Sequence, residues 1–203
     1  MMRLSAFVRD QRGASAAEFA LVLPLLMIVL FGSIDIGRYG WNLSQAQKAT
    51  QVGARWAAAT DLLSKGLYDY SFATSGGIPQ GNPVGPTAFP GVICDSTGCR
   101  CPAGGTCAYD EELVAPGAFT RLVDRMAQIY PGLTADNVEV IYSNSGLGFS
   151  GDPNGADVAP LVTVRLRNLQ FAPFTSFVWG AQFDLPSFAY SLPMEDGSGE
   201  TSN

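Results

Sequence analysis

The chain has 203 residues, only 15% of them are charged, and the formal net charge is −6. This acidic balance, without any run of Lys or Arg, argues against a nucleic-acid partner, because such proteins need a basic patch to neutralise phosphates. Histidine is absent, which removes the commonest general base and the commonest metal ligand. We therefore expect no enzyme, no cofactor and no metal, although Asp, Glu, Lys and Cys chemistry stays open.

An apolar segment near the N-terminus is long enough to cross a bilayer. The run Phe19–Ile34 has 16 residues, and counting back to Ala14 makes 21, with Ser15 and Glu18 among them. At about 1.5 Å per residue, a helix of this length spans about 30 Å, the thickness of the hydrocarbon core. Three arginines precede it against a single aspartate. The positive-inside rule then places the N-terminus in the cytoplasm and the chain after Asp35 outside.

Three interpretations of this segment differ in where the chain is cut. A secretory signal peptide has an apolar run of about 7–15 residues and then a small-residue cleavage site, but the residues after Ile34 (DIGRYGWN) show no such site. A plain signal anchor is not cut, and in this interpretation Glu18 has no function. A prepilin signal is cut before the apolar run, so that the run remains in the mature protein, and this interpretation explains the most residues.

The residues from Gly13 to Phe19 resemble the signal that prepilin peptidases recognise. They read Gly-x-x-x-x-Glu-Phe behind a short basic leader. Cleavage after Gly13 would make Ala14 the new N-terminus and Glu18 its fifth residue. Glycine lets a protease approach the backbone. The Glu18 carboxylate can pair with the free amine of Ala14, in the same chain or in a neighbour, which offsets the desolvation of both charges.

A longer ordered set of residues resembles the TadE-like pseudopilins of tight-adherence (Flp-type) pilus systems. The set lies between Arg9 and Ala59 and comprises small residues before Glu18-Phe19, Leu-Pro-Leu at 23–25, an acidic residue at Asp35 and the segment Gly53–Arg55.

The resemblance implies a minor pilin of the bacterial inner membrane that takes part in pilus assembly and surface attachment. It would cross the membrane once, with its C-terminal domain in the periplasm or incorporated in a pilus. Its partners would be a prepilin peptidase, other pilin or pseudopilin subunits and the assembly machinery. The alternative is an uncleaved, signal-anchored periplasmic binding or sensing module.

Three residues of the helix join Glu18 as candidates for packing between subunits. Pro24 removes one backbone hydrogen bond and tends to kink a helix, although membrane helices also tolerate proline. Ser33 and Gly37 are four residues apart, a spacing that lets two helices approach closely.

The helical pattern continues past the membrane segment, from Ile36 to Ser64, with apolar residues at steps of three and four. Lys65-Gly66 is the expected stop. The predicted organisation is a cytoplasmic leader (1–13), a transmembrane helix (14–34), a periplasmic pilin-like domain (35–194) that contains a Cys-bearing loop (75–116), and a disordered tail (195–203).

The loop 75–116 is rich in Gly and Pro and holds all four cysteines, Cys94, Cys99, Cys101 and Cys107. An even count in an exported domain favours two disulfides. Zinc is the alternative, but zinc sites usually show paired C-x-x-C spacing. Of the three connectivities, the one that joins Cys99 to Cys101 is strained by the single intervening residue, and the other two stay open.

The remaining chain predicts a helix at Ala118–Tyr130 and three strands. The clearest strand is Leu161–Arg167, in which apolar and polar residues alternate. The other strands are Val138–Ser143 and Phe183–Leu192, with a short helix at Pro173–Trp179 before the last. We predict an α+β, pilin-like fold in which the long N-terminal helix packs on a small antiparallel sheet.

Two motifs in the region 146–157 resemble ligand-binding sites, but the residues around them argue against such a function. Gly146-x-Gly148-x-x-Gly151 follows a strand like a dinucleotide fingerprint, but a turn sequence stands where the required helix should begin. Asp152, Asn154 and Asp157 could bind calcium through oxygen ligands, and turn-capping is the favoured role for these side chains.

Overall fold

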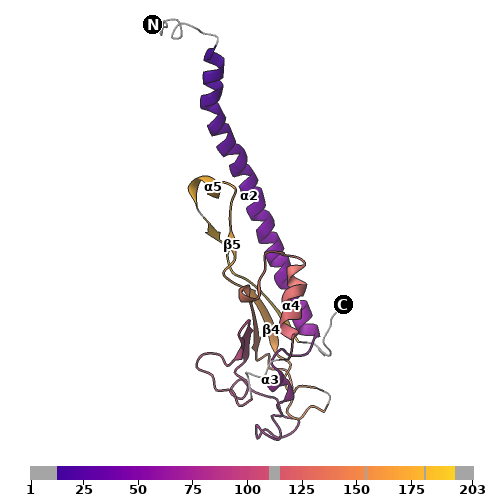
Figure 1. Cartoon of the computed structure of the whole chain (residues 1–203). Helices are drawn as coiled ribbons and strands as arrows, with labels where there is room; N and C mark the ends of the chain where they lie inside the picture. The colour runs from indigo at the N-terminus through magenta and orange to yellow at the C-terminus, as the bar shows by residue number, and fades with distance from the viewer. Residues whose placement is uncertain (1–12, 110–114, 154, 181, 195–203) are drawn as a thin grey trace, which may run out of the picture. The chain divides into compact units, whose positions relative to one another are not determined.

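The computed structural model describes residues 13–109, 115–153, 155–180 and 182–194 (Figure 1). The predicted leader before Gly13 and the predicted disordered tail 195–203 lie outside these residues. The chain forms two compact units. We call Met1–Trp41 with Phe171–Phe183 the helix unit, and Asn42–Gln170 with Asp184–Asn203 the sheet unit.

The longest element is α2, Ala14–Ala59, a single helix of 46 residues that contributes to both units. This confirms that the helix continues beyond residue 34, but the predicted stop at Lys65-Gly66 is wrong. The Thr60 hydroxyl donates to the Trp56 carbonyl (3.0 Å) just where α2 ends. Lys65 instead begins a short helix, α3, Lys65–Asp69, because the Ser64 side chain accepts a hydrogen bond from the Leu67 amide and caps it.

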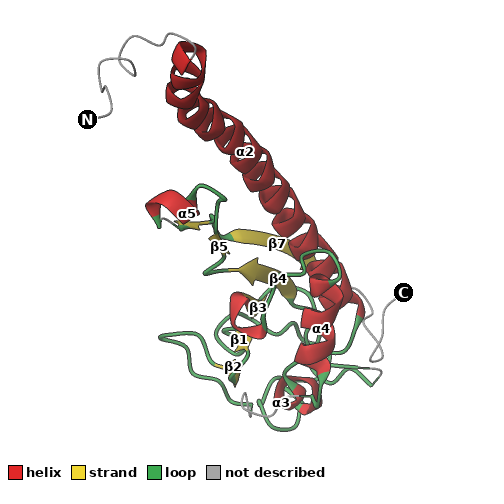
Figure 2. Cartoon of the chain, turned by 45° about the horizontal axis from the view of Figure 1, so that its top comes forward, coloured by secondary structure: helices red, strands yellow, loops and turns green. Residues whose placement is uncertain are grey.

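A five-stranded, wholly antiparallel sheet organises the sheet unit, in the order β2-β1-β3-β4-β7 (Figure 2). Together with α2 it confirms the predicted α+β class. Its strands are β1, Val92–Asp95; β2, Gly98–Arg100; β3, Val138–Ser143; β4, Leu161–Leu166; and β7, Phe188–Pro193.

The predicted strand Phe183–Leu192 is divided in the structure. Its start is β6, Phe183–Asp184, which pairs with β5, Gln170–Phe171, in a separate two-stranded sheet. Its second half is β7. Pro186 lies between them and has no amide hydrogen to give to a ladder. Leu185, which is buried and lies between the two strands, donates its amide to the Leu169 carbonyl (2.8 Å).

The glycines and prolines of region 75–116 predict a loop, but the structure is not a loop throughout. It contains the hairpin of β1 and β2, in which Cys94 stands directly opposite Cys99. The turn depends on Gly98, which has a φ of 132°. Residues with a Cβ rarely adopt this backbone conformation. The prediction missed the hairpin because its strands are only a few residues long and show no periodicity.

The core of the sheet unit forms on one face of the sheet. Alternate residues of β3 and β4 are fully buried there: Val138, Val140, Tyr142, Val162, Val164 and Leu166. The helix α4, Ala118–Ala127, adds Leu122, Val123 and Met126 to this core. It ends three residues before the predicted boundary at Tyr130. The short helix α5, Ser176–Trp179, falls within the predicted range, and η2, Ala135–Asn137, precedes β3.

The part of α2 that belongs to the sheet unit packs closely on α4. Ala46, Ala49, Ala54 and Ala57 are buried along it. At Gly53 an added Cβ would lie 2.5 Å from the Met126 sulfur. Gly53, which opens the segment Gly53–Arg55, therefore permits the approach of the two helices.

We predict that Gly53→Ile lowers the free energy of unfolding by about 1–3 kcal/mol relative to Gly40→Ile, because overpacking a filled core costs that much. Gly40 lies in the same helix, and an added Cβ there meets nothing within 4 Å, so the control carries the same change in helix propensity. Thermal unfolding of the two full-length variants in detergent measures the difference. Equal melting temperatures would contradict the packing role of Gly53.

Candidate functional site

The predicted processing residue, Gly13, stands immediately before α2 and is exposed. An added Cβ at Gly13 would meet no other described atom within 4 Å. Nothing within the described chain therefore requires glycine at this position, and a glycine requirement would have to come from a molecule that acts on it. The start of α2 at Ala14 places the predicted new N-terminus at the first residue of the helix.

Glu18 and Phe19 lie on the second turn of α2, and both are exposed. Glu18 is four residues after Ala14, so the two lie about one helical turn apart, on the same side of the helix. This spacing is compatible with pairing between the carboxylate and an amine at Ala14. The cleavage that would create that amine stays a prediction.

The predicted subunit-packing residues lie along one continuous helix. α2 runs unbroken through Pro24, and the hydroxyl of Ser33 donates to the Val29 carbonyl of its own helix (2.8 Å). Gly37 is exposed, and an added Cβ there meets nothing within 4 Å. A close-approach surface is thus open at Gly37, while contacts with another subunit remain a prediction.

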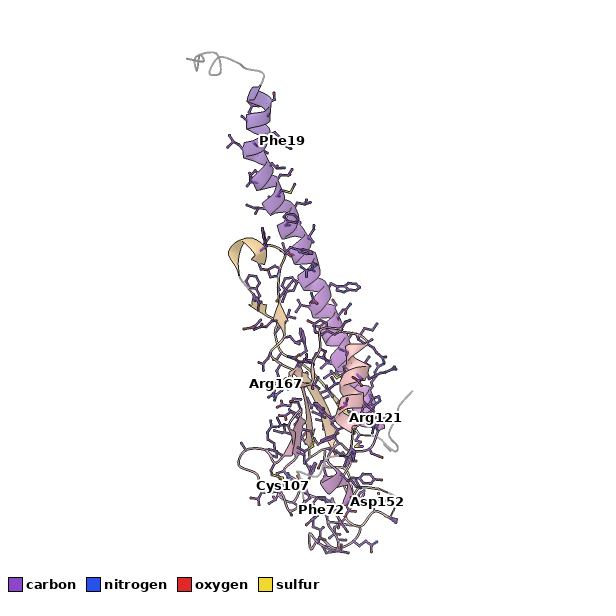
Figure 3. All side chains as sticks on the ribbon, viewed as in Figure 1. Phe19, Phe72, Cys107, Arg121, Asp152 and Arg167 are labelled. Carbon is purple, nitrogen blue, oxygen red and sulfur yellow. A yellow bond between two sulfur atoms is a disulfide. The ribbon has the colours of Figure 1, made fainter. Side chains whose placement is uncertain are left out.

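The first part of α2 presents an uninterrupted apolar surface. Figure 3 labels Phe19 near its start, and the large apolar side chains beyond it stand clear of the helix. Their exposed fractions run from 42% to 81% for Phe19, Leu21, Val22, Leu25, Leu26, Ile28, Val29, Leu30, Phe31 and Ile34. Among the described residues, this is the one helix long and apolar enough to cross a bilayer, as judged from length and composition.

Asp35 follows directly after this apolar surface, and its side chain is buried. One carboxylate oxygen accepts the Phe174 amide (2.6 Å), and the other accepts the amide and the hydroxyl of Thr175 (both 2.9 Å). Residues 171–183, which we call the aromatic loop, are thereby attached to α2 within the helix unit (Figure 1). The sequence pointed to Asp35 only as part of a family resemblance and gave no indication of its partners.

Arg38, one turn further along α2, completes this attachment. Its guanidinium lies 3.3 Å from an Asp35 oxygen and donates to the Ala172 carbonyl (3.5 Å). It also lies over the ring of Phe174, 4.2 Å from the centroid, a favourable cation–π geometry. Tyr39 meets the ring of Phe171 edge to face at 5.5 Å. The attachment is therefore both ionic and aromatic.

The charge on Asp35 is stabilised by these donors. Burial alone would raise its pKa, but the amides of Thr175 and Phe174, the Thr175 hydroxyl and the Arg38 charge together lower that pKa below its ordinary value. Because the pKa is lower in the folded state, the attachment contributes stability above the ordinary pKa and loses it only as the pH falls through the folded value. At neutral pH the carboxylate is ionised and the attachment is complete.

The four cysteines form two disulfides, Cys94–Cys99 and Cys101–Cys107. The structure thus holds the disulfides predicted over zinc, and it selects one of the two connectivities that the spacing left open. The first bond crosses the hairpin of β1 and β2. The second closes the following loop, where Figure 3 labels Cys107. Both bonds fix the shape of a region with little regular structure.

Asp157, a candidate calcium ligand, is buried and turned toward backbone amides. Its two oxygens accept the Phe72 amide (2.6 Å) and the Asp152 amide (3.0 Å), and Figure 3 shows Phe72 and Asp152 at the same end of the sheet unit. Asn154 lies outside the described residues. Asp157 therefore caps the turn at Asp152, as predicted for this residue, and in addition joins that turn to the distant loop at Phe72.

The glycines of the apparent dinucleotide fingerprint serve a turn. Gly146, Gly148 and Gly151 all have positive φ, and the residues described after them contain no helix until α5. At Gly148 an added Cβ would lie 2.6 Å from the Asp157 carbonyl oxygen, so this glycine allows two backbones to approach. The expectation that no nucleotide binds here stays a prediction.

Two carboxylates and three arginines form a polar cluster on the outer face of the sheet. Glu139 is buried and pairs with Arg100, Arg165 and Arg167, while Asp95 pairs with Arg100 and Arg167. The cluster joins β1, β2, β3 and the end of β4. Alternation in β4 indicated the outward direction of its arginines, but their carboxylate partners lie on other strands.

The pKa of Asp95 in this cluster is strongly displaced. Burial alone would raise it, but hydrogen bonds from the hydroxyl and amide of Thr97 and the Arg100 guanidinium lower it to about 2. The lowered pKa means that this carboxylate stabilises the fold above its ordinary value, 3.8, and loses the contribution between there and about pH 2. Each cluster residue thus has a structural partner, and the arrangement is that of a stabilising network across strands.

Comparison with known proteins gives one match. The model of the family described as TadE-like protein matches residues 13–55. The matched segment begins at Gly13 and includes α2 as far as Arg55, and it confirms the resemblance predicted from the sequence. No curated protein and no solved structure matches the chain.

We predict that Asp35→Asn loosens the aromatic loop, because a neutral amide accepts these hydrogen bonds more weakly and brings its own N–H₂ donor against them. Amide hydrogen exchange at Phe174 and Thr175 should accelerate by about tenfold or more, since charge-assisted hydrogen bonds are roughly twice as strong as neutral ones. Asp69→Asn removes the same charge from an exposed pair with Lys65 and serves as the control. Unchanged exchange in the Asp35 variant would show that the carboxylate does not hold the loop.

Proposed function

We propose that the chain is a TadE-like pseudopilin, a minor subunit that takes part in assembling a tight-adherence pilus and in surface attachment. One observation carries this proposal: the TadE-like match begins at Gly13, the predicted cleavage residue, and includes the exposed apolar surface of α2. The role proposed is structural, with no catalysis by the chain itself. It acts as the substrate of a prepilin peptidase.

In this proposal the peptidase removes the leader by cutting between Gly13 and Ala14. Gly13 is exposed, and an added Cβ there meets no atom of the described residues within 4 Å, which supports access by a protease. The cut leaves a helix that starts with a free amine at Ala14 and carries Glu18 one turn later. The pair neutralises two charges that would be costly in hydrocarbon.

The helix then anchors the chain in the inner membrane, with residues 14–34 across the bilayer. The three arginines of the leader favour a cytoplasmic N-terminus, which places the chain after Asp35 in the periplasm. The two disulfides support this assignment, because such bonds persist in oxidising compartments.

The same apolar surface of α2 serves a second purpose in assembly. Side chains that contact lipid before assembly can contact other pilin or pseudopilin subunits afterwards, because both environments are apolar. The exposed Gly37 and the satisfied hydroxyl of Ser33 leave one side of the helix smooth for close approach. Glu18 would pair with the Ala14 amine of its own chain or of the next subunit.

Mass spectrometry of the mature N-terminus tests the proposal. We expect a chain that begins at Ala14 when the protein is made together with its prepilin peptidase. An intact residue 1 would support the alternative of an uncleaved, signal-anchored binding or sensing module. A cut near Asp35 would identify a secretory signal peptide, and either result would overturn the pseudopilin proposal.

We predict that Gly13→Leu blocks maturation, because a branched side chain at the scissile residue crowds the peptidase. The described chain has room for that side chain, so a loss of processing would reflect recognition by the peptidase. Gly37→Leu is the matched control, since Gly37 is also exposed and uncrowded. Immunoblotting of the precursor and the mature form measures the effect, and normal processing of the Gly13 variant would argue against the assigned cut.

We predict that Glu18→Ala permits processing but impairs pilus assembly, because the Ala14 amine then enters an apolar environment without a partner. Glu18→Gln should have the same effect as Glu18→Ala, since it keeps the shape of the side chain and removes the charge. Glu18→Asp, which keeps the charge, should retain part of the pilus assembly. The measurements are the mature N-terminus and the amount of surface pili. Unchanged piliation in the Ala and Gln variants would remove Glu18 from this role.

A further inference from the structure

The aromatic loop has a composition unlike that of an ordinary connection on a protein surface. Residues 171–183 read FAPFTSFVWGAQF, with five aromatic residues and no Asp, Glu, Lys or Arg. Phe174, Phe177 and Phe183 are exposed, and Phe177 is 94% exposed. Solvent-facing apolar groups gathered in one segment mark a surface that meets another apolar phase or partner.

The loop is held at a defined point along α2. Asp35 accepts two of its backbone amides, and Arg38 and Tyr39 contact Ala172, Phe174 and Phe171. All these residues belong to the helix unit. Asp35 comes directly after the segment 14–34 that the proposed function places across the bilayer, and this inference rests on that placement. The loop must then lie at the boundary between hydrocarbon and water.

The backbone of the loop is suited to that boundary. The amides of Ser176, Phe177 and Gly180 donate to carbonyls within the loop, those of Pro173, Phe174 and Ser176. The amides of Phe174 and Thr175 are taken up by Asp35. Groups satisfied in this way do not need water, which lowers the cost of bringing these five amides to an apolar layer.

We propose that the aromatic loop binds the phospholipid bilayer that α2 crosses, with Phe177 and Phe174 inserted at the level of the headgroups on the side where α2 emerges. The loop would act as a second, shallow contact that fixes the depth of the helix. The exposed phenylalanines favour lipid as the occupant, because segments that lie in a membrane interface bury Phe, Trp and Leu side chains there. The absence of charge in the loop and the direct continuity with the apolar surface of α2 favour it as well.

Photo-crosslinking of the full chain in vesicles of phosphatidylethanolamine and phosphatidylglycerol tests this proposal. Three variants each carry one benzophenone amino acid: Phe177→p-benzoylphenylalanine in the loop, Phe31→p-benzoylphenylalanine in the span, and Phe149→p-benzoylphenylalanine in the sheet unit. All three phenylalanines are exposed, and each substitution keeps an aromatic ring. Mass spectrometry after irradiation identifies lipid adducts and protein adducts separately.

We expect lipid adducts at Phe177 in a yield close to that at Phe31 and several times that at Phe149. Lipid adducts at Phe31 without any at Phe177 would overturn the inference and leave the membrane-spanning helix intact. Adducts at Phe177 to protein alone would likewise overturn it and would identify the loop as a contact between subunits. A lack of lipid adducts at Phe31 would instead count against the proposed function itself.

Discussion

The structure depends on a change of surface along one unbroken helix, which occurs at Asp35. Before it, α2 turns large apolar side chains outward, and its charged residue is Glu18. A helix satisfies its own backbone hydrogen bonds, so the same element can pass from lipid to water without a break. What must change is the outer surface, and at Asp35 α2 forms hydrogen bonds with a distant part of the chain. The proposal that residues 14–34 form the span rests on this change as well as on hydrophobicity.

Single buried carboxylates repeatedly join segments of the fold that are distant in sequence. Asp35 holds the aromatic loop, Asp157 ties Phe72 to Asp152, and Glu139 gathers three arginines across strands. Each carboxylate is buried and accepts several donors at once, which is how an ionised group can be withdrawn from water. A chain rich in glycine and proline has long connections, and these contacts with the two disulfides give the connections fixed positions.

Sequence reasoning succeeded where structure depends on neighbours along the chain. Strand β3 matches its predicted range, β4 nearly so, and α4 begins at its predicted first residue, because alternation and helical spacing are local signals. It failed at Lys65, where the cap formed by Ser64 decides the outcome, and in the hairpin of Cys94 and Cys99, whose strands are too short to show a period. The partners of Asp35 could not be predicted, since Thr175 lies 140 residues away and two of the three donors are backbone amides.

The distance between Asp35 and its partners explains why the matched segment does not include the residues that Asp35 binds. The TadE-like match covers residues 13–55, which includes Asp35 and excludes the aromatic loop. Two of the loop's three donors to Asp35 are backbone amides, of Phe174 and Thr175, and any residue other than proline supplies such a donor. The hydrogen bonds to Asp35 therefore require a carboxylate but place little restriction on the loop residues that donate the two amides. The ring contacts of Arg38 and Tyr39, in contrast, require aromatic residues in the loop. Within the matched segment, by contrast, Gly53 acts through the absence of a side chain. The roles proposed for Gly13 and Glu18 also depend on which side chain is present. A sequence signal confined to the helix is what this division of physical roles predicts.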